Sequence, residues 1–372
     1  MTVVSADSAQ SRCPAAPRVA IVHDFLVSRG GAERVALTMA RAFPEAPIHT
    51  ALHDADGTFE GFSDHQIRPL LLDRFRVFRH HHRLSLPLLQ AAFSRRVIDA
   101  DVVLCSSSGF AHNVSTTGRK VVYCHTPARW LHDQERYLDR FGPAARTSAK
   151  LLTRGAHRRD VRAMLGADRI LANSRTIGDH ISAVYGRKAE VVAPCSSLAL
   201  DDTITPIEGV TPGFVLCPSR ALGYKRLDVL AAAASRVPSI QFVQVGDGPD
   251  LARLQRGSPP NLRFLGEVSD AELRWAYSNA SVVVLTSAED FGLVPVEATA
   301  HGLMSIVPEA RGLLDHVEDG VNGWFYSFGD DESLAELVES KFDTAAVPPV
   351  TDPLGERRFT AALHRVVSEV VR

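Results

Sequence analysis

The chain has 372 residues, more than a single hydrophobic core usually serves, so two domains are expected. Hydrophobic residues make up 45% and charged residues 23%, which is ordinary for a globular protein. The formal net charge of −2 argues against a nucleic-acid-binding protein, and no apolar run approaches the length of a transmembrane helix.

The beginning of the chain and the cysteines both fit a protein of the reducing cytoplasm. Residues 1–17 are small and polar and lack the apolar region of a signal peptide, so we expect a disordered leader. The cysteines are odd in number and form no Cys-x-x-Cys, which disfavours disulfides and a zinc site. They are Cys13, Cys105, Cys124, Cys195 and Cys217.

Short apolar runs alternate with helix-like segments along the rest of the chain. Continuous Val, Ile and Leu runs between turn residues are typical of parallel strands buried on both faces, and their alternation with helices predicts doubly wound α/β sheets. The first expected strands are Arg18–His23, Pro47–Leu52, Asp101–Cys105, Lys120–Cys124, Arg169–Ala172 and Glu190–Ala193. The second series is Phe214–Cys217, Ile240–Val245, Asn261–Leu265, Ser281–Thr286 and Met304–Val307.

A polar stretch without periodicity divides the two series of strands. Residues 198–212 contain two prolines and are predicted to form an interdomain linker. The last helix is expected over Leu354–Val371, where apolar residues recur at helical spacing. We therefore expect one Rossmann-like domain of residues 18–197 plus 354–372 and a second of residues 213–345.

Two features of the N-terminal half follow expected strands. Gly30 and Gly31 stand between the first strand and a helix pattern, where a glycine pair lets the backbone approach a ligand at a helix N-terminus. A plain turn is an equal alternative, because the three-glycine dinucleotide fingerprint is absent. His125 follows the fourth strand, at the sheet edge where ligands bind, although a structural histidine is common there.

The C-terminal half offers cations and a second tight turn. Arg220 and Lys225 come just after its first strand and could hold a diphosphate, although paired surface cations are common. Gly246 follows the next strand and predicts a tight loop over the edge of the sheet.

The most specific pattern is a pair of glutamates, Glu289 and Glu297, directly after a buried strand. Between them Phe291, Gly292 and Leu293 are expected to present backbone N–H groups at the start of a helix, with Glu297 in its first turn. Amides suit phosphate oxygens and carboxylates suit sugar hydroxyls. The alternative is helix capping by either glutamate.

Three other patterns could suggest a metal, and we expect none of them to bind one. Two Asp-x-Asp sequences are short and frequent by chance, one in a polar loop and one before a strand. A histidine triplet is better explained as an exposed basic run. These residues are Asp54 and Asp56, Asp99 and Asp101, and His80, His81 and His82.

A basic and apolar segment spans Arg68–Arg96, with Asp73 as its single acid. Such segments bind anionic bilayers, so we expect a membrane or acceptor contact formed by two helices, or by a helix and a loop, because Pro87 limits any single helix. The alternative is a solvated helix pair packed on its own sheet. The arginines expected to make the contact are Arg76, Arg79 and Arg83.

Together these motifs resemble retaining glycosyltransferase family four, over nearly the whole chain from Arg18 to about Val367. The matching residues are the Glu-x7-Glu pair Glu289 and Glu297, the cations Arg220 and Lys225, the loop Gly30-Gly31, and His125. The resemblance implies the GT-B fold, an α/β architecture in which two Rossmann-like domains face a cleft and the C-terminal helix returns to the N-terminal domain.

The resemblance also implies roles for these residues. Arg220 and Lys225 would neutralise the departing diphosphate with the Phe291–Leu293 amides, and the leaving phosphate would take the acceptor proton. Glu289 would hold donor sugar hydroxyls and Glu297 the ribose hydroxyls. His125 would contact the donor sugar and the glycine loop would close over the phosphate. Gly246 and Val268 complete the implied donor site, which needs no metal or cofactor.

Two stretches, Tyr123–Pro127 and Ser219–Arg226, look most like bacterial polysaccharide mannosyltransferases. They make GDP-mannose the first expected donor and another nucleotide sugar, such as a UDP-sugar, the alternative. The implied acceptor is a glycan or lipid-linked molecule of cell-surface polysaccharide or glycolipid synthesis. We expect no nucleic acid partner, and a cytoplasmic protein that is peripheral at the inner face of the plasma membrane.

The chain departs from the family in two loops. Asp315 stands where a glutamate is usual, and Ala193–Ser196 replaces a Pro-Pro-x-Asp sequence, which bears on the identity of the donor. Two other functions remain open. One is a different GT-B enzyme, such as a nucleotide-sugar epimerase or a phosphorolytic enzyme. The other is a non-catalytic subunit of a transferase complex, against which the intact Arg220, Lys225 and glutamate pair argue.

Overall fold

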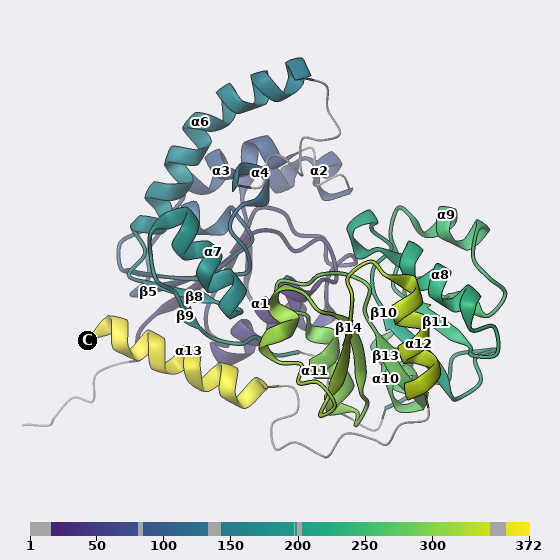
Figure 1. Cartoon of the computed structure of the whole chain (residues 1–372). Coiled ribbons are helices and arrows are strands. Elements are labelled where there is room, and N and C mark those ends of the chain that lie inside the picture. Colours follow the sequence, from purple (N-terminus) through teal and green to yellow (C-terminus); the bar gives the residue numbers. More distant parts are fainter. Residues whose placement is uncertain (1–15, 81–84, 133–142, 197, 199–202, 343–354) are drawn as a thin grey trace, which may run out of the picture.

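The computed structural model contains two large parallel sheets flanked by helices and a small sheet of two strands (Figure 1). It describes residues 16–80, 85–132, 143–196, 198, 203–342 and 355–372. The first domain contains β1 (Val19–His23), α1 (Gly31–Ala42), β2 (Ile48–Thr50), β3 (Ile67–Pro69), α2 (Arg76–His80), α3 (Leu86–Ser94), β4 (Val97–Ile98), β5 (Val102–Ser107), β6 (Ser115–Thr116), β7 (Arg119–Cys124), α4 (Arg129–His132), α6 (Pro143–Leu165), β8 (Arg169–Ala172), α7 (Arg175–Tyr185) and β9 (Glu190–Val191). The second contains β10 (Phe214–Pro218), α8 (Leu227–Arg236), β11 (Phe242–Val245), α9 (Leu251–Arg256), β12 (Leu262–Phe264), α10 (Asp270–Asn279), β13 (Ala280–Val284), α11 (Leu293–Ala300), β14 (Ser305–Pro308), β15 (Gly323–Tyr326) and α12 (Asp331–Lys341), and α13 (Glu356–Val371) follows.

Both sheets have the doubly wound order that the strand–helix alternation predicts. The first runs β3-β2-β1-β5-β7-β8-β9 and the second β12-β11-β10-β13-β14-β15, with parallel pairing throughout the described strands. The chain order reverses beside β1 in the first sheet and beside β10 in the second. Ligands of open α/β sheets bind at such reversals, outside the carboxyl ends of the strands.

Each expected strand overlaps one in the structure, but four described strands were missed: β3, β15, and the short pair β4 and β6, which form a small sheet of their own. β15 is Gly-Trp-Phe-Tyr, an aromatic run unlike the Val and Ile runs used to recognise the others. β3 is Ile-Arg-Pro, in which proline is compatible with an edge position. The expectation of helices and loops alone over residues 68–96 is therefore wrong at its start, because Arg68 and Pro69 belong to β3.

The last helix returns to the first domain, as the resemblance implies. α13 packs against α1, β5 and β7, and the Phe359 ring lies 5.5 Å from the Tyr123 ring. Burying an apolar side chain of this size contributes about 1.5–3 kcal/mol, so the helix is an integral part of that core. All five of its predicted apolar residues are buried: Phe359, Leu363, Val366, Val367 and Val370.

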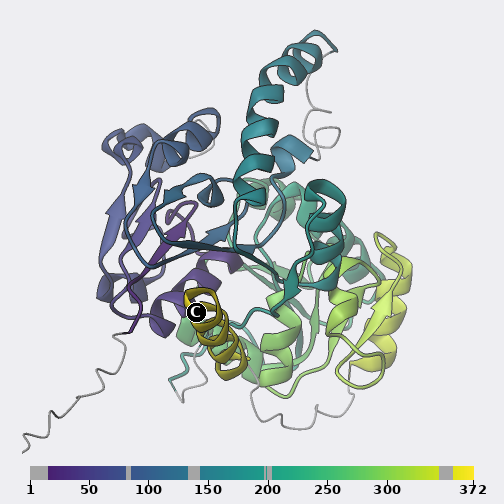
Figure 2. The same cartoon turned by 90° about the vertical axis from the view of Figure 1, so that its left-hand side faces the viewer.

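The cysteines inside the described ranges are free and buried, and Cys13 lies outside those ranges, as does most of the expected leader. Burial raises the pKa of Cys105 and of Cys217 to about 12, so both thiols stay protonated. No helix in the described part of the chain is long and apolar enough to span a bilayer. Figure 2 shows α6 projecting well beyond the rest of its domain.

Candidate active site

The glycine loop of the first domain meets the start of α11 from the second. A Cβ at Gly31 would lie 3.5 Å from Cδ1 of Leu293, in ordinary contact. Residues 262 positions apart in sequence, both predicted as donor contacts, are thus neighbours in space. This contact places the site between the carboxyl ends of the two sheets, where strand-order reversals favour ligands.

Glu33 shapes the glycine loop and was missed from the sequence. Gly30 caps α1, and a Cβ there would lie 2.5 Å from Glu33 Oε2, so no larger residue fits without moving that carboxylate. Ser28 Oγ donates to Glu33 Oε1 at 2.7 Å. Burial raises the pKa of the Glu33 carboxyl. A glutamate three residues after a cap is a recognised helix-start signal, and it could have identified Glu33.

Lys225 and Glu289 form an ion pair at the centre of the second domain's site. Lys225 Nζ lies 2.6 Å from Glu289 Oε1, and both side chains are about four-fifths buried. Burial acts to lower the Lys225 pKa, but the Glu289 carboxylate outweighs it and the net pKa is raised. Arg220 follows β10, is exposed, and forms no ion pair within the described ranges.

The segment before α11 has a backbone that only glycine tolerates. Gly292 has φ of +90°, and a Cβ there would lie 2.7 Å from Leu313. The Phe291 ring stacks on His316 with centroids 4.3 Å apart, which fixes the turn. α11 begins at Leu293, so the first amides of the helix lie at the predicted position.

Glu297 lies deeper than the sequence suggested. It belongs to the second turn of α11 and not, as expected, to the first, because the helix begins at Leu293. The side chain is buried, and its oxygens accept hydrogen bonds from Ser196 Oγ at 2.6 Å and Tyr277 OH at 2.7 Å. Ser196, in one of the departing loops, therefore orients the second glutamate of the pair.

Gly246 and Val268 lie near the same strand ends. Gly246 follows β11 with φ of +125°, and a Cβ there would lie 2.8 Å from the carbonyl oxygen of Ser219. The loop can thus pass over the end of β10 only with glycine. Val268 is half-buried just before α10 and packs against the core of its domain.

His125 belongs to a buried chain of three side chains on neighbouring strands. Ser106 Oγ lies 2.8 Å from His125 Nε2 and 3.0 Å from His23 Nδ1. Burial lowers the pKa of His23 to about 4 and that of His125 to about 3, so both imidazoles are neutral at pH 7. The serine hydroxyl donates to one ring and accepts from the other, which couples their tautomers.

These histidines predict a pH-dependent stability. The unfolded chain binds protons near pH 6.5, whereas the folded histidines resist them until about pH 4, so stability falls as pH drops through this range. At pH 5 each histidine lowers the free energy of unfolding by about 2 kcal/mol relative to neutral pH. Urea unfolding of His23→Gln should therefore depend less steeply on pH than that of the wild type.

The comparison with the variant is needed because Asp24 acts in the opposite direction. Burial raises the pKa of Asp24 to about 6, although hydrogen bonds from the backbone N–H groups of Ser108, Phe110 and Ala111 act to lower it. Equal slopes for the two proteins between pH 7 and pH 5 would contradict the role given to His23.

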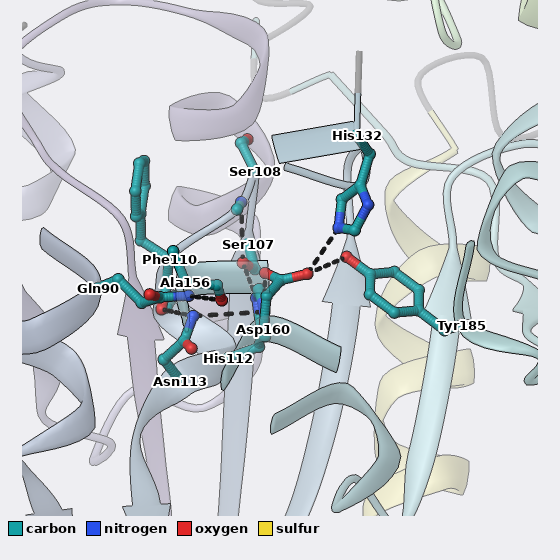
Figure 3. Close-up of polar contacts among 12 residues, drawn as sticks. Gln90, Ser107, Ser108, Phe110, His112, Asn113, His132, Ala156, Asp160 and Tyr185 are labelled. Carbon is teal, nitrogen blue, oxygen red and sulfur yellow. Dashed lines mark hydrogen bonds and ion pairs between the residues drawn. The ribbon is translucent and has the colours of Figure 1, made fainter. Parts of the chain in front are cut away.

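A second polar cluster lies behind the strand ends, around the fully buried Asp160 of α6 (Figure 3). Its carboxylate accepts from His112 Nε2 at 2.9 Å, and from His132 Nε2 and Tyr185 OH at 2.8 Å. His112 is also 2.8 Å from Ser107 Oγ, at the end of β5. The cluster therefore joins α4, α6 and α7 to the loop beneath the site.

Opposite charges meet where the two domains touch. The first domain supplies arginines and the second supplies acids: Arg29 with Glu267 at 3.2 Å, Arg34 with Asp270 at 3.4 Å, Arg175 with Asp315 at 3.0 Å, and Arg129 with Asp290. Asp315 is the residue that replaces the usual glutamate, and its partner Arg175 is at the start of α7. No sequence motif indicated these pairs.

The remaining predicted residues either lie away from this site or fall outside the described ranges. Arg76 is exposed on α2, Arg79 pairs with Asp73 at 2.9 Å, and Arg83 lies outside the described ranges. Asp99 and Asp101 pair with Arg18. Within the described residues, no three metal-ligating side chains gather, Asp54 and Asp56 included, and His81 and His82 fall outside them.

A comparison with known families bears on the second domain. A family model described as group 1 glycosyl transferases matches residues 213–342. This part of the chain is therefore similar to group 1 glycosyl transferases. The matched region contains Arg220, Lys225, Glu289 and Glu297, that is, the cations and the glutamate pair of the candidate site.

Curated relatives match part of the chain. A GDP-mannose-dependent alpha-mannosyltransferase of Corynebacterium glutamicum is 36% identical over 129 residues, which are 34% of this chain and 30% of that protein. A D-inositol 3-phosphate glycosyltransferase of a Mycobacterium species is 28% identical over 199 residues, 47% of this chain and 44% of that protein. The chain thus matches less than half the length of either relative.

Solved structures match nearly the whole chain and show the fold. The Anabaena protein HepE, in complex with UDP and glucose, has a TM-score of 0.66 at 19% identity, covering 95% of this chain and 100% of that one. Sucrose-phosphate synthase of Thermosynechococcus elongatus has a TM-score of 0.61 at 16% identity, covering 95% and 94%. The predicted GT-B fold is confirmed.

Proposed function

We propose that the protein is a glycosyltransferase that moves a hexose from a nucleotide sugar to a glycan or lipid-linked acceptor with retention of configuration. One observation carries the proposal: the N-terminal glycine loop contacts Leu293 at the start of α11, in the region similar to group 1 glycosyl transferases and near the Lys225–Glu289 pair. At such a junction, groups from both domains can bind the phosphates and the sugar of a donor at once.

The mechanism follows from charge that develops on the leaving diphosphate. Arg220, Lys225 and the amides at the start of α11 stabilise it, which is commonly the largest catalytic contribution. Glu289, held beside Lys225, receives donor hydroxyls, while the buried Glu297 receives the ribose. His125 is neutral and meets the donor sugar as a hydrogen-bonding group. The leaving phosphate takes the acceptor proton, and no metal is required.

We propose GDP-mannose as the first donor and UDP-glucose as the second. The Corynebacterium relative is named GDP-mannose-dependent, and HepE was solved with UDP-glucose. A panel of nucleotide sugars, assayed for hydrolysis in excess chelator, tests the proposal: one donor should be cleaved, with an α-linked product from an α-linked donor. An inverted product, loss of activity that magnesium or manganese restores, or epimerisation without acceptor would each contradict it.

We further propose that the surface around α2 and α3 contacts an anionic membrane. Leu71 is 72% exposed and Phe75 is 59% exposed, and both lie among the exposed arginines Arg68, Arg74 and Arg76. Exposed apolar side chains beside cations fit the boundary between lipid headgroups and acyl chains. Arg79 contributes less than the sequence suggested, because Asp73 already neutralises it.

Removing Arg74 and Arg76 together should weaken vesicle binding. Each arginine near an anionic surface contributes on the order of 1 kcal/mol, so the double serine variant should bind about thirtyfold less tightly. Flotation with phosphatidylserine-containing vesicles measures this, and added salt should weaken it further. Arg253→Ser with Arg256→Ser, two exposed arginines on α9, is the matched control. Equal partitioning onto neutral and anionic vesicles, or onto neither, would refute the contact.

A further inference from the structure

Two consecutive carboxylates each hold a cation at the candidate donor site. Glu289 binds Lys225 of its own domain, whereas Asp290 binds Arg129 from the other domain. Arg129 is the first residue of α4, four residues after His125. Asp290 immediately precedes the Phe291–Leu293 segment. The Arg129 guanidinium therefore lies at the same loop as the cation and amides proposed to hold the diphosphate.

Asp290 is held in place without Arg129. Arg311 Nη1 donates to its other oxygen, Oδ1, at 2.9 Å. Ser174 Oγ donates to its backbone carbonyl at 2.6 Å. Asp290 itself is mostly buried, with 12% of its side chain exposed. Asp290 thus keeps a charge partner and a fixed backbone when Arg129 moves away. Little free energy is therefore lost when Arg129 leaves Asp290 to bind another anion.

Arg129 has the capacity for a second anion. Its side chain is 47% exposed, whereas that of Lys225 is 17% exposed. A guanidinium has five N–H donors in a planar fork, and the contact with Asp290 uses one of them through Nη2. The remaining donors match a phosphate that offers two oxygens side by side.

We propose that Arg129 is a third cation of the donor site and binds the second phosphate of a nucleoside diphosphate. This inference rests on the proposed function. A nucleoside diphosphate gains negative charge as it leaves, so a cation in addition to Arg220 and Lys225 stabilises it further. Arg129 approaches from the other domain, so its phosphate contact would also tie the two domains together around the donor.

Binding of nucleotides that differ by one phosphate tests the assignment. Titration calorimetry gives the Kd of UDP and GDP, and of UMP and GMP, which lack the second phosphate. Arg129→Ala should raise the Kd of UDP and of GDP at least tenfold, because a hydrogen bond to a charged group is lost. The monophosphates should bind within about twofold of wild type, which also shows that the variant is folded. For Arg129→Lys, the Kd of UDP and of GDP should fall between those of the wild type and of Arg129→Ala.

Two further variants separate phosphate binding from simple domain contact. Asp290→Asn removes the acid but keeps Arg129, so diphosphates should bind as tightly as to wild type or more tightly. Arg175→Ala breaks a matched interdomain pair with Asp315, and it should leave all four Kd values unchanged.

The outcomes that overturn the inference differ from those that overturn the function. Equal weakening by Arg129→Ala and Asp290→Asn would mean that the pair serves domain contact alone. Equal weakening of monophosphates and diphosphates by Arg129→Ala would mean that the second phosphate is not its ligand. If the wild type bound neither UDP nor GDP, the proposed function itself would fail.

Discussion

Lys225→Ala is expected to lower turnover about 100-fold, because losing one group that stabilises developing charge costs roughly 3 kcal/mol. The lysine is mostly buried and lies 2.6 Å from Glu289, so its removal also leaves that carboxylate without its cation. Arg220→Ala should lose a similar factor through the diphosphate alone. The measurement is kcat with the preferred donor at saturation.

The control for this prediction is Lys188→Ala, which removes an exposed lysine from the other domain. It should leave kcat unchanged. If both Lys225→Ala and Arg220→Ala kept turnover within about twofold of the wild type, the diphosphate site would lie elsewhere.

Asp160→Ala is expected to destabilise the first domain by about 3–5 kcal/mol, because it strands the buried partners of an ionised group. Burial alone would raise the Asp160 pKa, but hydrogen bonds from His112 and His132 outweigh it and hold the pKa below its usual value. The carboxylate is therefore charged at neutral pH. Its loss leaves two imidazoles and the Tyr185 hydroxyl without an acceptor.

Urea unfolding of the variant and the wild type at pH 7 measures this effect. Asp179→Asn, an exposed acid on α7, is the matched control and should shift stability by less than about 0.5 kcal/mol. A loss below about 1 kcal/mol for Asp160→Ala would show that the cluster does not anchor α6.

The strands and the glutamate pair could be predicted because their signals are local. Val and Ile runs mark buried strands wherever they occur, and the spacing of Glu289 and Glu297 is contained in one loop and one helix. Strands were missed where the local signal is weak, as in the aromatic β15 and in β3, which contains a proline. Glu297 was expected in the first turn of α11 but lies in the second, because the residue at which a helix begins cannot be located closely from sequence.

The contacts between distant residues could not be predicted from spacing. Arg129 and Asp290 are 161 positions apart, and His112 and Asp160 are 48 apart. Each residue alone resembles ordinary surface charge or a core histidine. Their partners depend on how two sheets and several helices pack, which a single sequence does not encode in any short pattern. Most of the polar network around the predicted site residues was therefore found only in the structure.

The position of α13 sets an order for folding during synthesis. Phe359, Leu363 and Val366 fill the core of the first domain, yet they are made after the whole of the second domain. Residues 213–342 can fold as a unit while the ribosome is still translating, because domains generally do so once complete. The first domain must wait with part of its apolar core uncovered until residues 356–371 emerge. During that interval the nascent chain is the form most exposed to chaperones and to aggregation.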